Sequence, residues 1–282
     1  MRRKPFGPTK VSVPVIGQGT WHMGESRRAR AAEVAALRLG LELGMAHVDT
    51  AEMYGRGGAE EVIAQALVGV RRDDVFLVSK VLPDHATHAG TKRACEQSLR
   101  RLRTDYLDLY LLHWASHVPI GETMRAMEEL VAEGKIRLVG VSNFDVSEVR
   151  EAMAALGRER LACNQVLYNL GQRGIERDLI PFCADHGIAV VGYTPFGQWP
   201  GPRTAASAVL EEVAARHGAT PQQVALAFLT RQPNLFAIPK ASDEAHVRAN
   251  AASGELALSA GDIAEIDAAF PAPKRSAPLA TG

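Results

Sequence analysis

An aspartate and a tyrosine lie close together in the stretch HVDTAEMYGRGGAEE, which spans residues 47 to 61. Asp49 ends a short apolar run, and Tyr54 follows five residues later beside several glycines. One interpretation is ordinary turn chemistry, with the aspartate as a cap and the tyrosine as a packed aromatic. The other interpretation is that the two residues are half of a group that transfers a proton. A tyrosine with a pKa near ~10 holds its proton at neutral pH, and a nearby cation stabilises the phenolate when that proton leaves.

Polar residues also end the other apolar runs of the chain. They are Ser79 and Lys80, His113 and Trp114, Ser142 and Asn143, Asn164 and Gln165, Tyr193 to Pro195, and Pro239 and Lys240. Each of them alone has a structural explanation, such as a cap, a solvated lysine or a hydrogen-bonded histidine. Together they indicate chemistry if the fold brings them to one place.

Eight apolar runs, rich in β-branched residues, must position these side chains. They are centred near residues 16, 47, 77, 109, 138, 164, 190 and 236, and all but the last interval are about 26 to 32 residues long. One strand and one helix account for such an interval, and the last one leaves room for two helices. The pattern predicts a parallel sheet covered by helices, in the form of a single α/β (β/α)₈ TIM barrel with one or two extra helices.

Local signals mark several helices between the runs. Residues 30–43 and 122–132 place apolar side chains on one face, and Gly134 is a predicted C-cap. Asp145 with Glu148, and Thr220 with Pro221 and Gln223, are predicted N-terminal capping groups. The arginine-rich stretches 27–30 and 100–103 are interpreted as solvated helix faces.

Composition narrows the class of protein. The chain has 282 residues, of which 46% are apolar and 23% charged, with 32 basic and 32 acidic side chains. A balanced charge predicts no nucleic acid or membrane partner. Three separated cysteines, no signal peptide and no membrane-length apolar run indicate a reducing cytoplasm. We expect one domain over residues 1–282, with the tail 271–282 lying over the surface or partly flexible.

Two other kinds of site are disfavoured. A doubly wound dinucleotide-binding fold requires G-x-G-x-x-G after its first strand, and the third glycine is absent after Gly17 and Gly19. A metal-dependent barrel hydrolase requires three or more ligands with ordered partners. The histidine pairs 85/88 and 113/117 do not meet that requirement, so we expect no metal.

The stretches HVDTAEMYG, VFLVSK, DYLDLYLLHW, GKIRLVGVSNF, CNQVLYN, GYTPFG and AIPKAS occur in this order, and as a set they resemble the aldo-keto reductase superfamily. The resemblance covers residues 10 to about 270. Through GQGTWHMGE and NQVLYNLGQRGIERDL it is similar to bacterial members, including methylglyoxal reductases.

The resemblance implies a catalytic tetrad of Asp49, Tyr54, Lys80 and His113. Carbonyl reduction needs a hydride at carbon and a proton at oxygen, and a reduced nicotinamide supplies only the hydride. Tyr54 is then the acid and Lys80 its cationic support. Asp49 holds Lys80 in place, and His113 orients the carbonyl oxygen.

The resemblance also implies a cofactor site. Ser142, Asn143 and Gln165 match positions that bind the nicotinamide carboxamide, Tyr193 stacks on its ring, and Thr194 and Phe196 meet the pyrophosphate. Lys240 and Ser242 match the 2′-phosphate site, where His246 replaces a frequent arginine, and Asn250 matches the adenine position. NADP(H) is therefore expected to be favoured over NAD(H), and Trp21 and Trp114 are expected to wall the substrate pocket.

Two functions remain open from the sequence. The first is an NADPH-dependent reductase of small aldehydes, 2-oxoaldehydes and ketones, because the loops 115–121 and 197–203 are short and predict an open pocket. Its partner is a small carbonyl compound, and we expect a monomer. The second is a barrel that binds NADP as a sensor and has little turnover. Such a protein would need a dedicated extension for interaction with a partner, or a large apolar surface patch.

Overall fold

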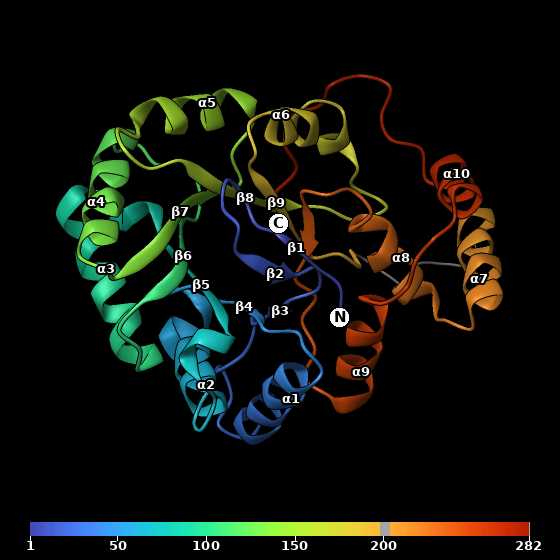
Figure 1. The fold of residues 1–282 in the computed structure, drawn as a ribbon, viewed down its shortest axis with the longest axis horizontal. Helices are drawn as coiled ribbons and strands as arrows, with labels where there is room; N and C mark the ends of the chain where they lie inside the picture. Colours follow the sequence, from blue (N-terminus) through green and yellow to red (C-terminus); the bar gives the residue numbers. More distant parts are fainter. Residues whose placement is uncertain (198–203, 282) are drawn as a thin grey trace.

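Eight parallel strands form the centre of the computed structural model, which describes residues 1–197 and 204–281 (Figure 1). In chain order they are β3 (Gln18–Gly19), β4 (His47–Asp49), β5 (Phe76–Val81), β6 (Leu107–Leu112), β7 (Ile136–Ser142), β8 (Leu161–Leu167), β9 (Ala189–Tyr193) and β10 (Leu235–Ala237). Each strand pairs with the next in sequence. A parallel bridge between Ile16 and Ala237 joins the last strand to the segment before the first. The sheet is therefore closed, and the predicted (β/α)₈ barrel is confirmed.

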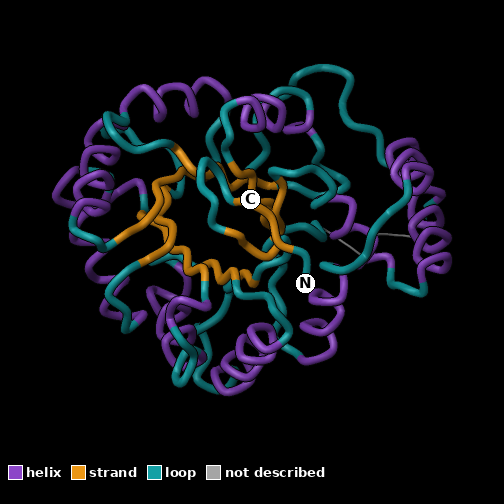
Figure 2. Tube along the Cα trace, viewed as in Figure 1, coloured by secondary structure: helices purple, strands orange, loops and turns teal. Residues whose placement is uncertain are grey.

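Helices surround the strands in Figure 2. The described part contains α1 (Arg30–Glu42), α2 (Gly58–Ala66), α3 (His88–Leu102), α4 (Ile120–Ala132), α5 (Val146–Ala155), α6 (Leu179–Asp185), α7 (Ala205–His217), α8 (Pro221–Leu229), α9 (Glu244–Ser253) and α10 (Ala260–Ala269). Short 3₁₀ turns are η1 (Tyr54–Gly57), η2 (Arg72–Asp74), η3 (Pro83–His85) and η4 (Gly174–Glu176). Both α7 and α8 lie in the long interval before β10, as predicted. No helix within these described ranges has the length and apolarity to cross a membrane.

The predicted capping groups are confirmed. Asp145 Oδ1 accepts from the backbone N–H of Glu148 at 2.9 Å, and Glu148 returns a hydrogen bond to the backbone of Asp145. Thr220 caps α8 in the same way, with Pro221 at the first helical position. Gly134 follows α4 with a φ of 72°, a left-handed conformation that ends the helix.

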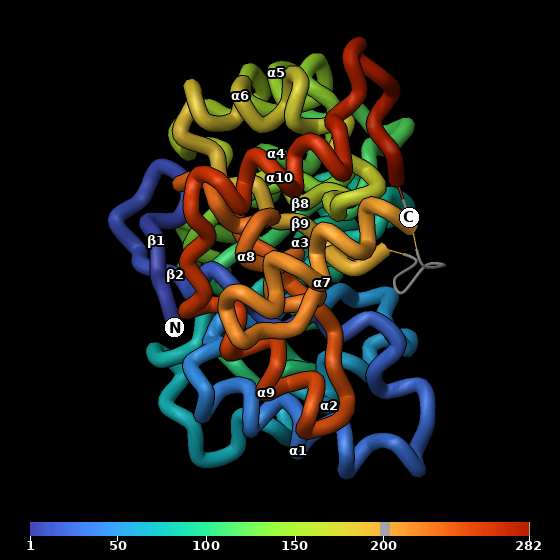
Figure 3. Tube along the Cα trace, turned by 90° about the vertical axis from the view of Figure 1, so that its right-hand side faces the viewer, coloured from blue at the N-terminus to red at the C-terminus, as the bar shows by residue number. Residues whose placement is uncertain are grey.

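An N-terminal hairpin was not predicted. The strands β1 (Arg3–Pro5) and β2 (Ser12–Pro14) pair antiparallel, so the apolar run near residue 16 is divided between this hairpin and the barrel. Figure 3 shows the hairpin at one end of the molecule, opposite the C-terminal end of the chain. The strands are only three residues long, which is too short for a clear period-two pattern.

Phe6, in the hairpin, fills the interior at that end. Its ring is fully buried, with ring centroids 4.8 Å from Phe76 and 5.0 Å from Phe236. Apolar side chains of six strands continue this core upward toward the carboxyl ends of the strands. The barrel is therefore packed with apolar side chains at this end, and the polar residues predicted at the strand ends lie toward the opposite end.

The tail is held against the barrel by α10. Arg173, which is almost completely buried, forms ion pairs with Glu176 and with Asp267 of α10, and it also bonds the backbone oxygen of Phe270. Leu279 packs on the core. The described tail thus lies over the surface. Most of the loop 197–203 falls outside the described residues.

Replacing Phe6 by alanine should lower the free energy of unfolding by about 3–5 kcal/mol, because it opens a cavity in a fully buried aromatic cluster. Urea unfolding at neutral pH measures the change. Val11→Ala, at a 47% exposed position in the same hairpin, is the control and should stay within about 0.5 kcal/mol. A loss below about 1 kcal/mol for Phe6→Ala would show that the barrel does not depend on this closure.

Candidate active site

A buried ion pair lies at the carboxyl ends of β4 and β5. Lys80 is fully buried, and its Nζ donates to Asp49 Oδ2 at 2.7 Å and to the backbone oxygen of Thr50 at 2.8 Å. The other carboxylate oxygen of Asp49 accepts from Gln165 Nε2 at 2.7 Å. Parallel pairing places both strand ends at the same edge of the barrel. Gln165 reaches the pair from β8, across the interior.

Tyr54 completes the contact with Lys80. Its hydroxyl lies 3.4 Å from Lys80 Nζ, at the start of the turn η1. Trp21 stacks on the Tyr54 ring at a centroid distance of 6.3 Å and is 43% exposed. One face of the tyrosine is thus covered by an aromatic side chain at the rim.

His113 stands next to Tyr54 at the end of β6. The two rings meet edge to face at 5.7 Å, and Trp114 stacks on His113 at 3.9 Å. Asn143 Nδ2 donates to the backbone oxygen of His113 at 3.1 Å. The four residues of the predicted tetrad are therefore brought together.

Burial and the lysine charge set the protonation states. Burial by itself lowers the pKa of Lys80, but the Asp49 carboxylate and the Tyr54 hydroxyl outweigh it, and the pKa lies above its ordinary value. Burial raises the pKa of Tyr54, and the Lys80 charge offsets only part of this rise. Burial and then the Lys80 charge lower the pKa of His113 to about 2. At neutral pH the site holds a cationic lysine, a protonated tyrosine and a neutral histidine.

A cavity of about 450 Å³ opens over these residues. Its lining includes the predicted residues Trp21, Asp49, Tyr54, His113, Trp114, Asn143, Gln165, Tyr193, Thr194, Phe196 and Lys240. It also includes His22 and Met53, which the sequence analysis missed although each is adjacent in sequence to a predicted residue. Lys80 lies behind the wall. The catalytic and most of the cofactor candidates therefore share one cavity.

Backbone strain gathers in this cavity. Among the described residues, five non-glycine residues have a positive φ, and three of them line the cavity: His22 at 63°, Asn143 at 62° and Thr194 at 50°. Strained backbone of this kind concentrates at functional sites, where surrounding contacts enforce it. The Tyr193 hydroxyl donates to Asn143 Oδ1 at 2.8 Å and holds two of the strained loops together.

Four cofactor candidates do not line the cavity: Ser142, Ser242, His246 and Asn250. Ser142 donates its hydroxyl to the backbone oxygen of Gln165 at 2.9 Å. Lys240 Nζ donates to Ser242 Oγ at 3.2 Å, just before α9. On that helix His246 is exposed and ion-paired with Asp243, and Asn250 is buried. Ser142 thus ends β7, whereas Ser242 lies just before α9 and His246 and Asn250 lie on it.

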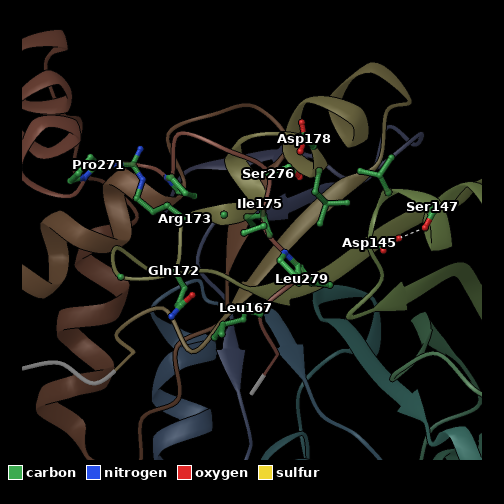
Figure 4. Close-up of a pocket in the computed structure, with 18 of the residues that line it drawn as sticks. Asp145, Ser147, Leu167, Gln172, Arg173, Ile175, Asp178, Pro271, Ser276 and Leu279 are labelled. Carbon is green, nitrogen blue, oxygen red and sulfur yellow. Dashed lines mark hydrogen bonds between the residues drawn. The ribbon is translucent and has the colours of Figure 1, made fainter.

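A second, larger cavity of about 1020 Å³ lies between the tail, the start of α5 and the loop before α6 (Figure 4). Ser276 and Leu279 of the tail line it, and so do Leu167 and Arg173. None of the tetrad residues belongs to its lining. In the parts of the chain that the structure describes, no cluster of three or more His, Cys, Asp or Glu could hold a metal ion.

Fold and site together define a (β/α)₈ barrel enzyme with its polar cluster at the carboxyl ends of the strands. The model of the aldo/keto reductase family matches residues 15–270, and the chain belongs to this family of NAD(P)H-dependent oxidoreductases. It is 50% identical over 266 residues to the methylglyoxal reductase YeaE of Escherichia coli K12, covering 94% of this chain and 93% of that protein.

Two further relatives agree with this assignment. The chain is 30% identical over 261 residues to the methylglyoxal reductase DkgB of Yersinia pestis, covering 91% of this chain and 92% of that protein. The crystal structure of an aldo-keto reductase from Klebsiella pneumoniae in complex with NADPH is 48% identical. It superposes with a TM-score of 0.93, covering 100% of this chain and 99% of that one.

The lysine charge also reaches His47, one layer below Asp49 on β4. The ring is fully buried beside Phe6 and Phe76, and neither ring nitrogen has a hydrogen-bond partner among the described residues. Burial and then the Lys80 charge lower the pKa of His47 to about 3. An unfolded histidine has a pKa near ~6.5 and takes up a proton first as the pH falls. The ionisation of His47 therefore costs the folded state nothing above about pH 6.5, and it destabilises the folded state progressively as the pH falls from there toward 3.

In the His47→Leu variant, the fall in unfolding free energy between pH 6 and pH 4 should be shallower by about 1.4 kcal/mol per pH unit than in the wild type. At neutral pH the variant should be about as stable as the wild type, because an unpaired buried polar group is replaced by an apolar one. Urea unfolding at several pH values measures both effects. Equal slopes for the two proteins would contradict the assignment of His47 as a buried neutral histidine.

Proposed function

We propose that this protein reduces small aldehydes, 2-oxoaldehydes and ketones to alcohols with NADPH, and that Tyr54 is the general acid. The observation that carries the proposal is the 3.4 Å contact between the Tyr54 hydroxyl and the buried Lys80 ammonium, at the wall of a cavity that also presents His113. A protonated tyrosine that faces a fixed cation suits the protonation of a carbonyl oxygen.

Each residue of the tetrad has a separate task. When bound, the reduced nicotinamide supplies the hydride for the carbonyl carbon. Tyr54 donates its proton to the oxygen, and the Lys80 charge stabilises the phenolate that remains. Asp49 keeps Lys80 charged and aimed at Tyr54. Neutral His113 donates a hydrogen bond to the carbonyl oxygen and orients it without losing a net proton.

The cavity suits a nicotinamide cofactor. Asn143 and Gln165 present side-chain amides for a carboxamide, and Tyr193 supplies an aromatic face. Lys240 is exposed beside Ser242 and is the cation for a 2′-phosphate. The Klebsiella relative solved with NADPH supports the choice of the phosphorylated cofactor.

The lining favours small, uncharged carbonyl compounds. Trp21, Met53 and Trp114 make the substrate side largely apolar. Among the described residues that line the cavity there is no arginine to bind a carboxylate or phosphate of a substrate. The two relatives described as methylglyoxal reductases support a 2-oxoaldehyde as one substrate.

The Tyr54→Phe variant should lose about 10²-fold or more in kcat with small aldehydes, because it removes only the transferred proton. Its Kd for NADPH should be unchanged. NADPH oxidation measured by absorbance and cofactor binding measured by fluorescence test the two statements. Tyr106→Phe, which removes a hydroxyl bonded to Asp73 before β6, is the matched control and should keep wild-type kcat.

Two outcomes would reject this assignment. If Tyr54→Phe keeps wild-type kcat, another group supplies the proton. If the wild type binds NADPH tightly but reduces no aldehyde in a panel that includes methylglyoxal, the NADP-sensing barrel becomes the better function.

Lys240→Ala should weaken NADPH binding by about tenfold and leave NADH binding nearly unchanged, because an exposed charge pair with a phosphate contributes on the order of 1 kcal/mol. Titration of each cofactor against intrinsic fluorescence measures the ratio. Lys10→Ala, at an exposed lysine in the hairpin loop, is the charge-matched control. An equal loss for both cofactors would place Lys240 away from the 2′-phosphate.

A further inference from the structure

The turn that carries Tyr54 is held by its surroundings. Directly after Tyr54, residues Gly55, Arg56 and Gly57 have left-handed backbone, with φ of 56°, 54° and 88°. Glycine adopts this conformation freely, but the non-glycine Arg56 keeps it only where neighbouring atoms enforce it. On one side a Cβ at position 55 would lie 2.8 Å from the backbone oxygen of Met23, so the turn packs directly on the loop before α1.

Arg101 of α3 closes the other side of the turn. A Cβ at position 57 would lie 2.5 Å from Cδ and 2.6 Å from Nε of Arg101, so the arginine crosses directly over Gly57. Its Nε then donates to Glu60 Oε2 at 2.5 Å, near the start of α2. Only a quarter of the Arg101 side chain is exposed, and Glu60 is fully buried. The interpretation of residues 100–103 as a solvated face is therefore wrong for Arg101.

The same buried carboxylate reaches the strand of Lys80. Glu60 Oε1 accepts from Ser79 Oγ at 2.7 Å, and Ser79, also fully buried, directly precedes Lys80 on β5. Arg101 is itself oriented by a hydrogen bond from Nη2 to Ser98 Oγ at 3.3 Å. One connected group, Arg101, Glu60 and Ser79, thus joins the turn of Tyr54 to the strand of Lys80.

We propose that Arg101 is a positioning residue for the proton transfer, which acts through Glu60 to hold Tyr54 within reach of Lys80. The inference rests on the proposed function. The Tyr54 hydroxyl and Lys80 Nζ are 3.4 Å apart, near the outer limit of a hydrogen bond, so a displacement of the turn by less than ~1 Å breaks the contact. A misplacement of this size can lower a rate by about 10²-fold.

The test compares Arg101→Ala and Arg101→Lys with the wild type, using NADPH and methylglyoxal. Arg101→Ala should lower kcat about tenfold or more at pH 7 with the Kd for NADPH unchanged, because the turn moves and the cofactor residues do not. Arg101→Lys keeps a cation opposite Glu60 and should recover most of the loss. The kcat values are corrected for the folded fraction, measured by circular dichroism.

A pH profile separates positioning from a general loss of stability. The Lys80 charge lowers the pKa of Tyr54 against the effect of burial, so a Tyr54 that drifts from Lys80 holds its proton to higher pH. In Arg101→Ala the alkaline fall of kcat should therefore move to higher pH. If Arg101 served only folding, the alkaline fall of kcat in Arg101→Ala would occur at the same pH as in the wild type.

Arg72→Ala is the matched control. Arg72 forms a comparable ion pair with the buried Asp108 at 2.7 Å, at the amino ends of the strands and away from the cavity. It should lose stability as Arg101→Ala does, but keep the wild-type kcat and pH profile. If Arg101→Ala does not fold, Arg101→Gln, which retains a donor to Glu60 without the charge, should show the same changes at smaller size.

Three results would overturn the proposal: wild-type kcat and pH profile in the folded Arg101→Ala or Arg101→Gln protein, the same kcat loss in Arg72→Ala, or no recovery in Arg101→Lys. Absence of aldehyde reduction by the wild type would instead count against the proposed function. The two failures are therefore distinguishable.

Discussion

The Lys80–Asp49 ion pair is the interaction on which the rest of the site depends. Two charges without water are costly unless every polar atom around them is satisfied. Here the ammonium donates to Asp49, to the backbone oxygen of Thr50 and to the Tyr54 hydroxyl, which accounts for its three protons. Both carboxylate oxygens of Asp49 are also bonded, the second one to Gln165. The interior tolerates the pair because each of its polar atoms has a hydrogen-bond partner. The same hydrogen bonds hold the Lys80 ammonium in contact with the Tyr54 hydroxyl.

The barrel explains how such a pair forms and why it is dry. Inward positions alternate along each strand, so the position two residues before Asp49 lies in the layer below it, and His47 occupies that position. Below the polar layer the interior is apolar and is closed by Phe6 from the hairpin. Both members of the ion pair are buried, with 0% of the Lys80 side chain and 2% of the Asp49 side chain exposed. The same burial keeps the two interior histidines, His47 and His113, uncharged.

The loops around the cavity contribute further residues to the site. Tyr54 stands on a left-handed turn, and Asn143 and Thr194 have similarly strained backbone around the cavity. Their conformations are maintained by contacts from other elements, such as the hydrogen bond from Tyr193 to Asn143. Rigid strands carry the charged pair, and constrained loops carry Tyr54, the proposed acid, and the proposed cofactor-binding residues Asn143 and Thr194.

The amino-acid sequence by itself determined the repeating architecture, because the spacing of apolar runs and the capping groups act locally. Asp145 and Thr220 cap their helices through neighbours three residues away, so their signals are complete within a short stretch. The resemblance to a known family, carried by several motifs in order, indicated the tetrad that the structure gathers.

Only the tertiary structure decided which distant residues meet. Gln165 bonds Asp49 across 116 residues, and Arg101 lies over Gly57 rather than in solvent. Neither contact has a local pattern, since each depends on the closure of the barrel and on the packing of α2 against α3. The short N-terminal hairpin was missed for the same reason: its strands are stabilised by the barrel end that they cover, through Phe6, and not by a periodicity of their own.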